Sequence, residues 1–84
     1  MSKQEKLLRK LLNGQFKNVK FSELKQLLLA FGFTLERVNG SHHIFVHKDI
    51  SEIVNIQNVK GEAKPYQIKQ IMQLIEKHDL KMED

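Results

Sequence analysis

Apolar residues change their spacing at Gly32, and this change limits the possible folds more than any other feature of the sequence. Before it, apolar side chains recur at the three- and four-residue spacing of one buried helix face: Leu24, Leu27, Leu28 and Phe31. Positions 33–38 then alternate between apolar and polar residues, a pattern typical of a half-buried strand. Glycine ends a helix at low cost because it tolerates a left-handed backbone. The sequence therefore predicts a helix followed directly by a strand.

Further elements are predicted on both sides of this pair. Leucines at helical spacing indicate a helix over 3–12, and Ser22 is predicted to cap the next helix. Asn39-Gly40 is typical of a tight hairpin, which would lead into strands at 42–47 and 52–57. Pro65 fits the first turn of a last helix. The residues from 76 onward, among them His78, are predicted to fray.

This order predicts an α+β fold, in which a three-stranded antiparallel sheet carries helices on one face. An extra N-terminal helix precedes the core of the fold. The predicted division is a helical arm over 1–20, a main domain over 21–80 and a charged tail over 81–84. The pattern leaves open which sheet face the helices cover, because Phe45 on one face and Ile44 and Val46 on the other are all apolar.

Composition narrows the classes of function. The chain has 84 residues, which is enough for one small domain and too few for a large cofactor cleft. It contains no cysteine, which excludes thiol nucleophiles, disulfides and cysteine-ligated zinc. A net charge of +4 favours a polyanionic partner such as nucleic acid. No stretch predicts a signal peptide or a membrane span, so a cytoplasmic protein is expected.

Three histidines lie close together in the predicted strand 42–47. Side chains alternate along a strand, so His43 and His47 share one face and His42 lies on the other. The Cα atoms of His43 and His47 are expected to lie roughly 13 Å apart, too far to hold one metal ion. No metal or other cofactor is predicted. Three roles for these histidines stay open at this point: a purely structural one, contact with phosphate, and general acid/base catalysis.

The segment around these histidines resembles a known signature. Residues 40–47, Gly-Ser-His-His-Ile-Phe-Val-His, resemble the glycine-serine-x-histidine motif of the HicA toxins, which are small bacterial mRNA interferases of the HicA/HicB toxin–antitoxin systems. The flanking residues agree with this family at three places: Phe31-Gly32-Phe33, Arg37 and Lys64-Pro65. The resemblance extends over about 21–80, which is most of the chain.

The resemblance implies a double-stranded-RNA-binding-like fold and metal-independent cleavage of mRNA. It also implies neutralisation by a HicB-like antitoxin and assigns the catalytic role to His43, which would act as a general base. Gly40 and Ser41 would shape the approach of the RNA. His47, on the same face, and Lys64, at a helix N-terminus, are further candidates for RNA binding. The alternative prediction is a non-catalytic RNA-binding module with the same fold.

Overall fold

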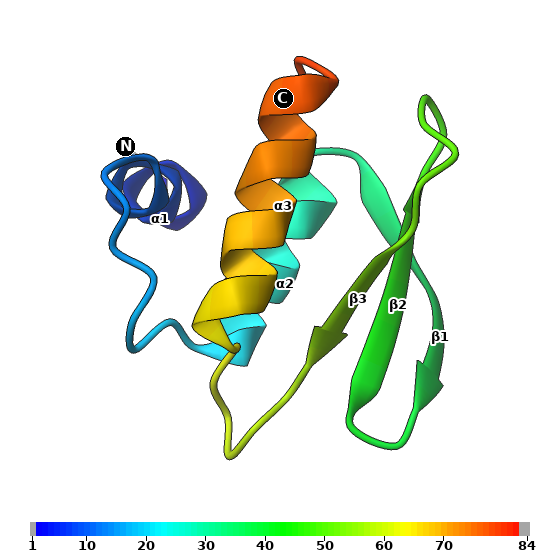
Figure 1. Ribbon diagram of the computed structural model, residues 1–84, viewed down its shortest axis with the longest axis horizontal. Helices are drawn as coiled ribbons and strands as arrows, with labels where there is room; N and C mark the ends of the chain where they lie inside the picture. Colours follow the sequence, from blue (N-terminus) through cyan, green and yellow to red (C-terminus); the bar gives the residue numbers. More distant parts are fainter. Residues whose placement is uncertain (1, 83–84) are drawn as a thin grey trace.

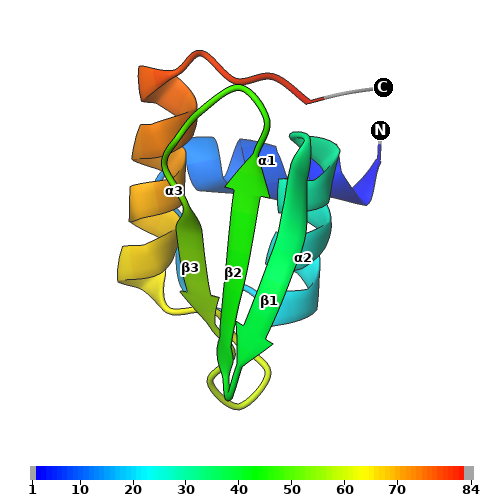
Figure 2. The ribbon, with the colours of Figure 1, turned by 90° about the vertical axis from the view of Figure 1, so that its right-hand side faces the viewer.

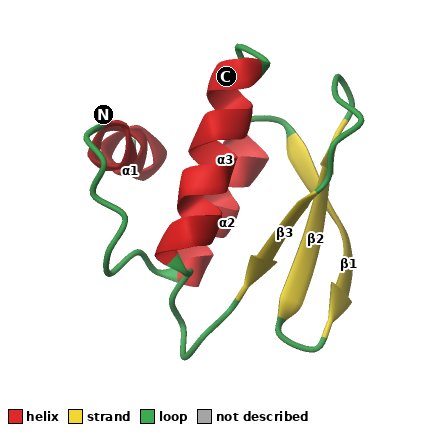
Figure 3. Ribbon diagram, in the orientation of Figure 1, coloured by secondary structure: helices red, strands yellow, loops and turns green. Residues whose placement is uncertain are grey.

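Three helices and a three-stranded antiparallel sheet follow one another in the predicted order (Figures 1 and 3). The structure is a computed structural model, and it describes residues 2–82. It confirms the predicted α+β class. The elements are α1 (Lys3–Leu12), α2 (Phe21–Ala30), β1 (Phe33–Asn39), β2 (His42–His47), β3 (Val54–Gln57) and α3 (Pro65–Lys77).

The elements form three layers (Figure 1). Helices α2 and α3 cover one face of the sheet, with α2 packed on β1 and α3 on β3, and α1 crosses them on the side away from the sheet. Strand β2 lies between β1 and β3, and the other face of the sheet carries no helix (Figure 2). One apolar core joins all of these layers, and its largest fully buried side chains are Leu11, Val19, Leu24, Leu27, Leu28, Phe33, Phe45, Ile56 and Ile68.

The burial of Phe45 shows which sheet face the helices cover. Phe45 is fully buried, and it pairs across the sheet with Leu35 on β1 and Val54 on β3. Because side chains alternate along β2, His43 and His47 lie on this covered face as well. Ile44 is also nearly buried, but on the open face, outside the main core. His43 therefore lies on the helix-covered face, near the N-terminal end of β2.

Helix α2 begins earlier than predicted. Its first residue is Phe21, its N-cap is Lys20, and no side chain caps it, so the predicted cap by Ser22 is wrong. A tertiary contact sets this start: the N–H of Phe21 donates to the carbonyl of Gly61, 2.9 Å away. The side chain of Phe21 is also buried. Packing therefore overrides the local capping preference of Ser22.

The N-terminal helix is part of the same core. Ser2 and Glu5 form a capping box, in which each side chain bonds to the backbone N–H of the other residue. Leu7 and Leu11 are buried against α2 and α3. Among the helices of residues 2–82, none combines the length and apolar character that a membrane crossing requires. The division between an arm over 1–20 and a domain over 21–80 stays a prediction.

The end of α3 is held in place, so the prediction of fraying from residue 76 is wrong for residues 76–78. Helix α3 continues to Lys77, and His78 is its C-cap. Glu52, in the β2–β3 connection, contacts both residues, at 2.9 Å from Lys77 Nζ and 2.6 Å from His78 Nε2. The hydrogen bond from Lys77, and secondly that from His78, lowers the pKa of the Glu52 carboxyl. Of the predicted charged tail over 81–84, residues 83–84 lie outside the described residues.

Candidate active site

The site begins at the turn between β1 and β2. Asn39 pairs with His42 as the last residue of β1, so the two turn residues are Gly40 and Ser41 rather than the predicted Asn39 and Gly40. Gly40 has a φ of +62°, which a side chain would make costly. A glycine at the first position of a two-residue hairpin is typical of a type II′ turn. This turn places His43 at the second residue of β2, next to the edge of the molecule.

The carbonyl of Ser41 orients the ring of His43. It accepts a hydrogen bond from the backbone N–H of Asn58 at 2.9 Å and lies 3.2 Å from Nδ1 of His43. A carbonyl oxygen can only accept, so Nδ1 must carry the proton in this bond. The neutral ring then leaves Nε2 as a bare nitrogen with a lone pair. Within residues 2–82, no hydrogen bond reaches Nε2 of His43.

Phe21 holds the same ring from the side of the helices. The centroids of the Phe21 and His43 rings lie 4.5 Å apart, with 56° between the ring planes. On the sheet, His43 pairs with Val38 on one side and Ile56 on the other. The His43 side chain is half-buried as a result. It is held in place by apolar neighbours and is still reached by solvent, which is the setting that a general base requires.

Two helix N-termini lie at this end of the molecule (Figures 1 and 2). Lys20 and Lys64 are the N-caps of α2 and α3, and neither helix has a side-chain cap. The ammonium of Lys64 lies 5.8 Å from the centre of the Tyr66 ring. Lys60 and Gly61, both with positive φ, form the turn that connects this end to Phe21. The N-terminus of a helix carries partial positive charge, so this end of the molecule favours an anion.

His47 has a different environment from His43, although both lie on the covered face. Its side chain is buried, and Nε2 lies 3.0 Å from the carbonyl of Phe31, to which it must donate. The backbone N–H of Asp49 donates to Nδ1, also at 3.0 Å, and the ring meets Phe33 edge-on. Both ring nitrogens are thus bonded to the backbone, with neither free for a phosphate. The structure gives His47 a structural role, and we leave it out of the proposed site.

His42 lies on the open face of the sheet. Its side chain is exposed, and Nδ1 lies 3.2 Å from Oδ1 of Asn55 on the neighbouring strand. His42 and His43 are therefore adjacent in sequence but point to opposite faces, as strand alternation predicts. Two residues that orient His43, Phe21 and Asn58, have no local signal in the sequence, because both contacts join segments that are distant along the chain.

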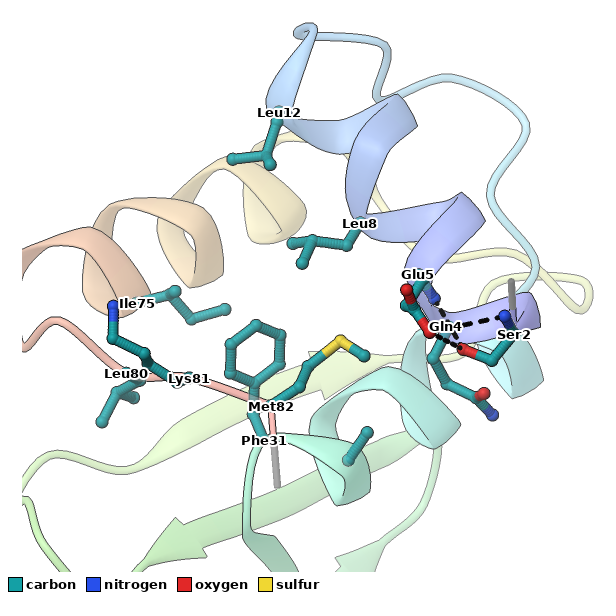
Figure 4. Close-up of a pocket in the computed structure, with 11 residues that line it drawn as sticks. Ser2, Gln4, Glu5, Leu8, Leu12, Phe31, Ile75, Leu80, Lys81 and Met82 are labelled. Carbon is teal, nitrogen blue, oxygen red and sulfur yellow. Dashed lines mark hydrogen bonds between the residues drawn. The ribbon is translucent and has the colours of Figure 1, made fainter. Parts of the chain in front are cut away.

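A wide groove of about 640 Å³ lies at the opposite end of α2 from His43 (Figure 4). Its walls come from α1, the ends of α2 and α3, and the segment after α3, and it is lined mainly by apolar side chains such as Leu8, Phe31, Leu80 and Met82. No histidine lines this groove, so it is not part of the candidate site around His43. Within residues 2–82, no cluster of three histidine, aspartate or glutamate side chains is arranged to hold a metal ion.

Comparison with known proteins identifies the family. The model of the HicA toxin of bacterial toxin–antitoxin systems matches residues 21–77, which include β2, the glycine turn and the start of α3. Searches of curated proteins and of solved structures gave no match. The family match covers more than half of the chain and confirms the resemblance that the Gly-Ser-His-His segment predicts. The chain therefore belongs to the HicA toxin family of bacterial toxin–antitoxin systems.

Proposed function

We propose that this toxin is an endoribonuclease that cleaves mRNA, with His43 as the general base. One observation carries the proposal: the hydrogen bond from Nδ1 of His43 to the Ser41 carbonyl leaves Nε2 bare, on a half-buried ring at the edge of the molecule. Membership of a toxin family fits this proposal. Because its substrate is mRNA, the toxin acts in the cytoplasm.

The proposed reaction is a transphosphorylation within the RNA. Nε2 of His43 takes the proton of a ribose 2′-OH, and the 2′-oxygen forms a bond to the adjacent phosphorus. The bond from phosphorus to the 5′-oxygen of the next nucleotide breaks, and this oxygen takes a proton from water. The products are a 2′,3′-cyclic phosphate and a 5′-hydroxyl end. RNA supplies its own nucleophile, so the protein needs only a base and positive charge.

Positive charge is available at the same end of the molecule as His43. Lys20 precedes Phe21, whose ring contacts the imidazole, and Lys64 begins the neighbouring helix. The uncapped N–H groups of these helices favour negative charge, as does each ammonium. In the proposed mechanism they stabilise the phosphorane that forms when the 2′-oxygen attacks. Gly40 adds room for the RNA, since no atom lies within 4 Å of the position that a Cβ would take there.

The proposed partner is a HicB-like antitoxin protein. The turn 40–41, the half-buried ring of His43 and the helix starts at Lys20 and Lys64 lie at one end of the molecule. A protein that covers this end blocks the approach of RNA to Nε2 without any change in the fold. The functional unit of this proposal is the domain over 21–80, and it uses no metal or other cofactor.

The test is to incubate the purified protein with a single-stranded RNA in the presence of a metal chelator. We expect cleavage, with cyclic phosphate and 5′-hydroxyl ends identified by mass spectrometry. The matched control is the same oligonucleotide with 2′-deoxyribose at the cleaved positions, which is expected to stay intact because it lacks the nucleophile. An RNA that is bound but never cut would contradict the proposal and would indicate a non-catalytic RNA-binding module instead.

A further inference from the structure

The positive charge of this chain is concentrated in its first twenty residues. They contain one acidic residue, Glu5, and six basic ones: Lys3, Lys6, Arg9, Lys10, Lys17 and Lys20. With histidines neutral, this segment has a net charge of +5. Residues 21–84 contain eight basic and nine acidic residues and have a net charge of −1. The family match begins at residue 21, so the net charge of +5 on residues 1–20 lies outside the matched part.

The lysines of this segment line a groove between α1 and the start of α2. Lys3, Lys6 and Lys10 are three and four residues apart, so they lie on one flank of α1. They line a groove of about 520 Å³ whose other wall includes Lys20 and Ser22. The segment between the two helices is tied across this groove, because Lys10 Nζ donates to the carbonyl of Lys17 at 3.2 Å. Four lysines from two separate segments thus line one groove.

Carboxylates in the described residues do not neutralise these lysines. The salt bridges of residues 2–82 lie elsewhere, around Glu52 and Asp79, and none includes a lysine of the groove. Glu23 is the single acidic residue that lines the groove. The groove also borders the uncapped N-terminus of α2, whose partial positive charge adds to that of the lysines. The electrostatic potential of the groove is therefore strongly positive, which favours binding of a chain of phosphates.

The groove and His43 lie on either side of the first turn of α2. Phe21 contacts the His43 ring on the sheet side, while Lys20, Ser22 and Glu23 line the groove on the side of α1. A helix with its side chains is about 10–12 Å across, which sets the scale of the distance between the two places. A single polyanionic strand can therefore occupy the groove and pass His43 around the N-terminus of α2.

We propose that this groove binds the phosphate backbone of the same RNA strand that His43 cleaves. The inference rests on the proposed function, since it takes RNA as the polyanion, and it assigns the substrate-binding role to Lys3, Lys6, Lys10 and Lys20. Residues 21–84, with their slight negative charge, hold RNA weakly on their own. The added helix supplies the attraction, because neutralised phosphates release counterions and strengthen binding.

The experiment measures binding of a fluorescently labelled single-stranded RNA to the full chain that carries His43→Ala, which prevents cleavage during titration. The groove variant adds Lys3→Gln, Lys6→Gln and Lys10→Gln. The matched control adds Arg9→Gln, Lys69→Gln and Lys81→Gln, which remove the same charge from exposed positions outside the groove. Circular dichroism and thermal unfolding establish that all proteins are folded.

We expect the groove variant to bind RNA at least about tenfold more weakly at about 50 mM salt. The slope of log K against log salt should become shallower by about 2, because each lost phosphate contact removes about 0.7. The control variant should keep most of the slope. Equal losses in the two variants, or no loss in either, would overturn the inference.

Two further outcomes separate this inference from the proposed function. If the wild-type protein cleaves RNA and the groove variant binds RNA normally, the groove proposal is overturned and the ribonuclease proposal stands. If the wild-type protein never cleaves RNA and the groove variant binds RNA more weakly than the parent protein, the ribonuclease proposal is overturned and the groove proposal stands. If the groove variant binds RNA normally and loses affinity for the antitoxin, the groove serves a protein partner, and the inference is overturned.

Discussion

Replacement of His43 by alanine is expected to lower the rate of RNA cleavage by about 10²–10⁴-fold, the usual contribution of a general base. The variant removes the bare Nε2 that is proposed to take the proton of the ribose 2′-OH. It leaves the backbone bond from Asn58 to Ser41 in place, so the turn and the start of β2 should be retained. The measurement is the initial rate of cleavage of one defined RNA, with thermal unfolding recorded on the same samples.

His42→Ala is the matched control for this variant. It removes the same imidazole from the neighbouring position, but His42 points to the open face and bonds to Asn55. We expect its cleavage rate to stay close to that of the wild type. A folded His43→Ala protein that cleaves at the wild-type rate would contradict the assignment of the base. Loss of activity in His42→Ala alone would move the site to the open face of the sheet.

Replacement of His47 by alanine is expected to lower the free energy of unfolding by about 2–4 kcal/mol, because it leaves one buried and one part-buried backbone group without its partner. These groups are the carbonyl of Phe31, at the end of α2, and the N–H of Asp49, after β2. The change also removes the edge-on packing of the ring against Phe33. Urea unfolding followed by circular dichroism measures the effect.

His47→Gln separates this structural role from a role in RNA binding. Its amide can donate to the Phe31 carbonyl in place of Nε2, so we expect it to recover part of the lost stability. The folded fraction of each His47 variant should bind and cleave RNA as the wild type does. A His47→Ala protein with unchanged stability and weakened RNA binding would show that this histidine contacts phosphate after all.

The order of the elements was predictable because the period of the apolar residues changes at Gly32, and because Gly40 and Pro65 indicate a turn and a helix start. These are local signals, each set by a few neighbouring residues. The helix-covered face of the sheet was not predictable. Phe45 and Ile44 are both buried, one in the main core and one on the open face, so burial of apolar residues on β2 does not distinguish the faces.

Contacts between distant segments explain the other differences. Phe21 starts α2 because its N–H reaches Gly61, forty residues along the chain, so Ser22 does not act as the cap. His78 is ordered because it contacts Glu52, which lies 26 residues before it. Neither pairing has a local pattern in the sequence. For the same reason, the spacing of residues alone predicted a fraying end where the chain is held by an ion pair.

For the candidate site, the motif singled out His43, but its chemistry depends on the structure. Spacing alone left the roles of His43 and His47 open, since both lie on one face of one strand. Their hydrogen bonds separate them: His43 has one ring nitrogen bonded, and His47 has both. The burial of His47 could not be predicted, because the pattern shows which face a side chain occupies and not what covers it.

The proposed mechanism requires that the neutral His43 ring carries its proton on Nδ1 and presents a bare Nε2. The nitrogen NMR shifts of this ring in the free protein, recorded at a pH at which the ring is neutral, distinguish the two tautomers. We predict the Nδ1–H tautomer, held by the Ser41 carbonyl. His42→Ala provides the assignment control, because its removal deletes the neighbouring signal alone. An Nε2–H tautomer for His43 would contradict the proposed mechanism, since Nε2 would then be a donor and the basic nitrogen, Nδ1, would face the Ser41 carbonyl and not the RNA.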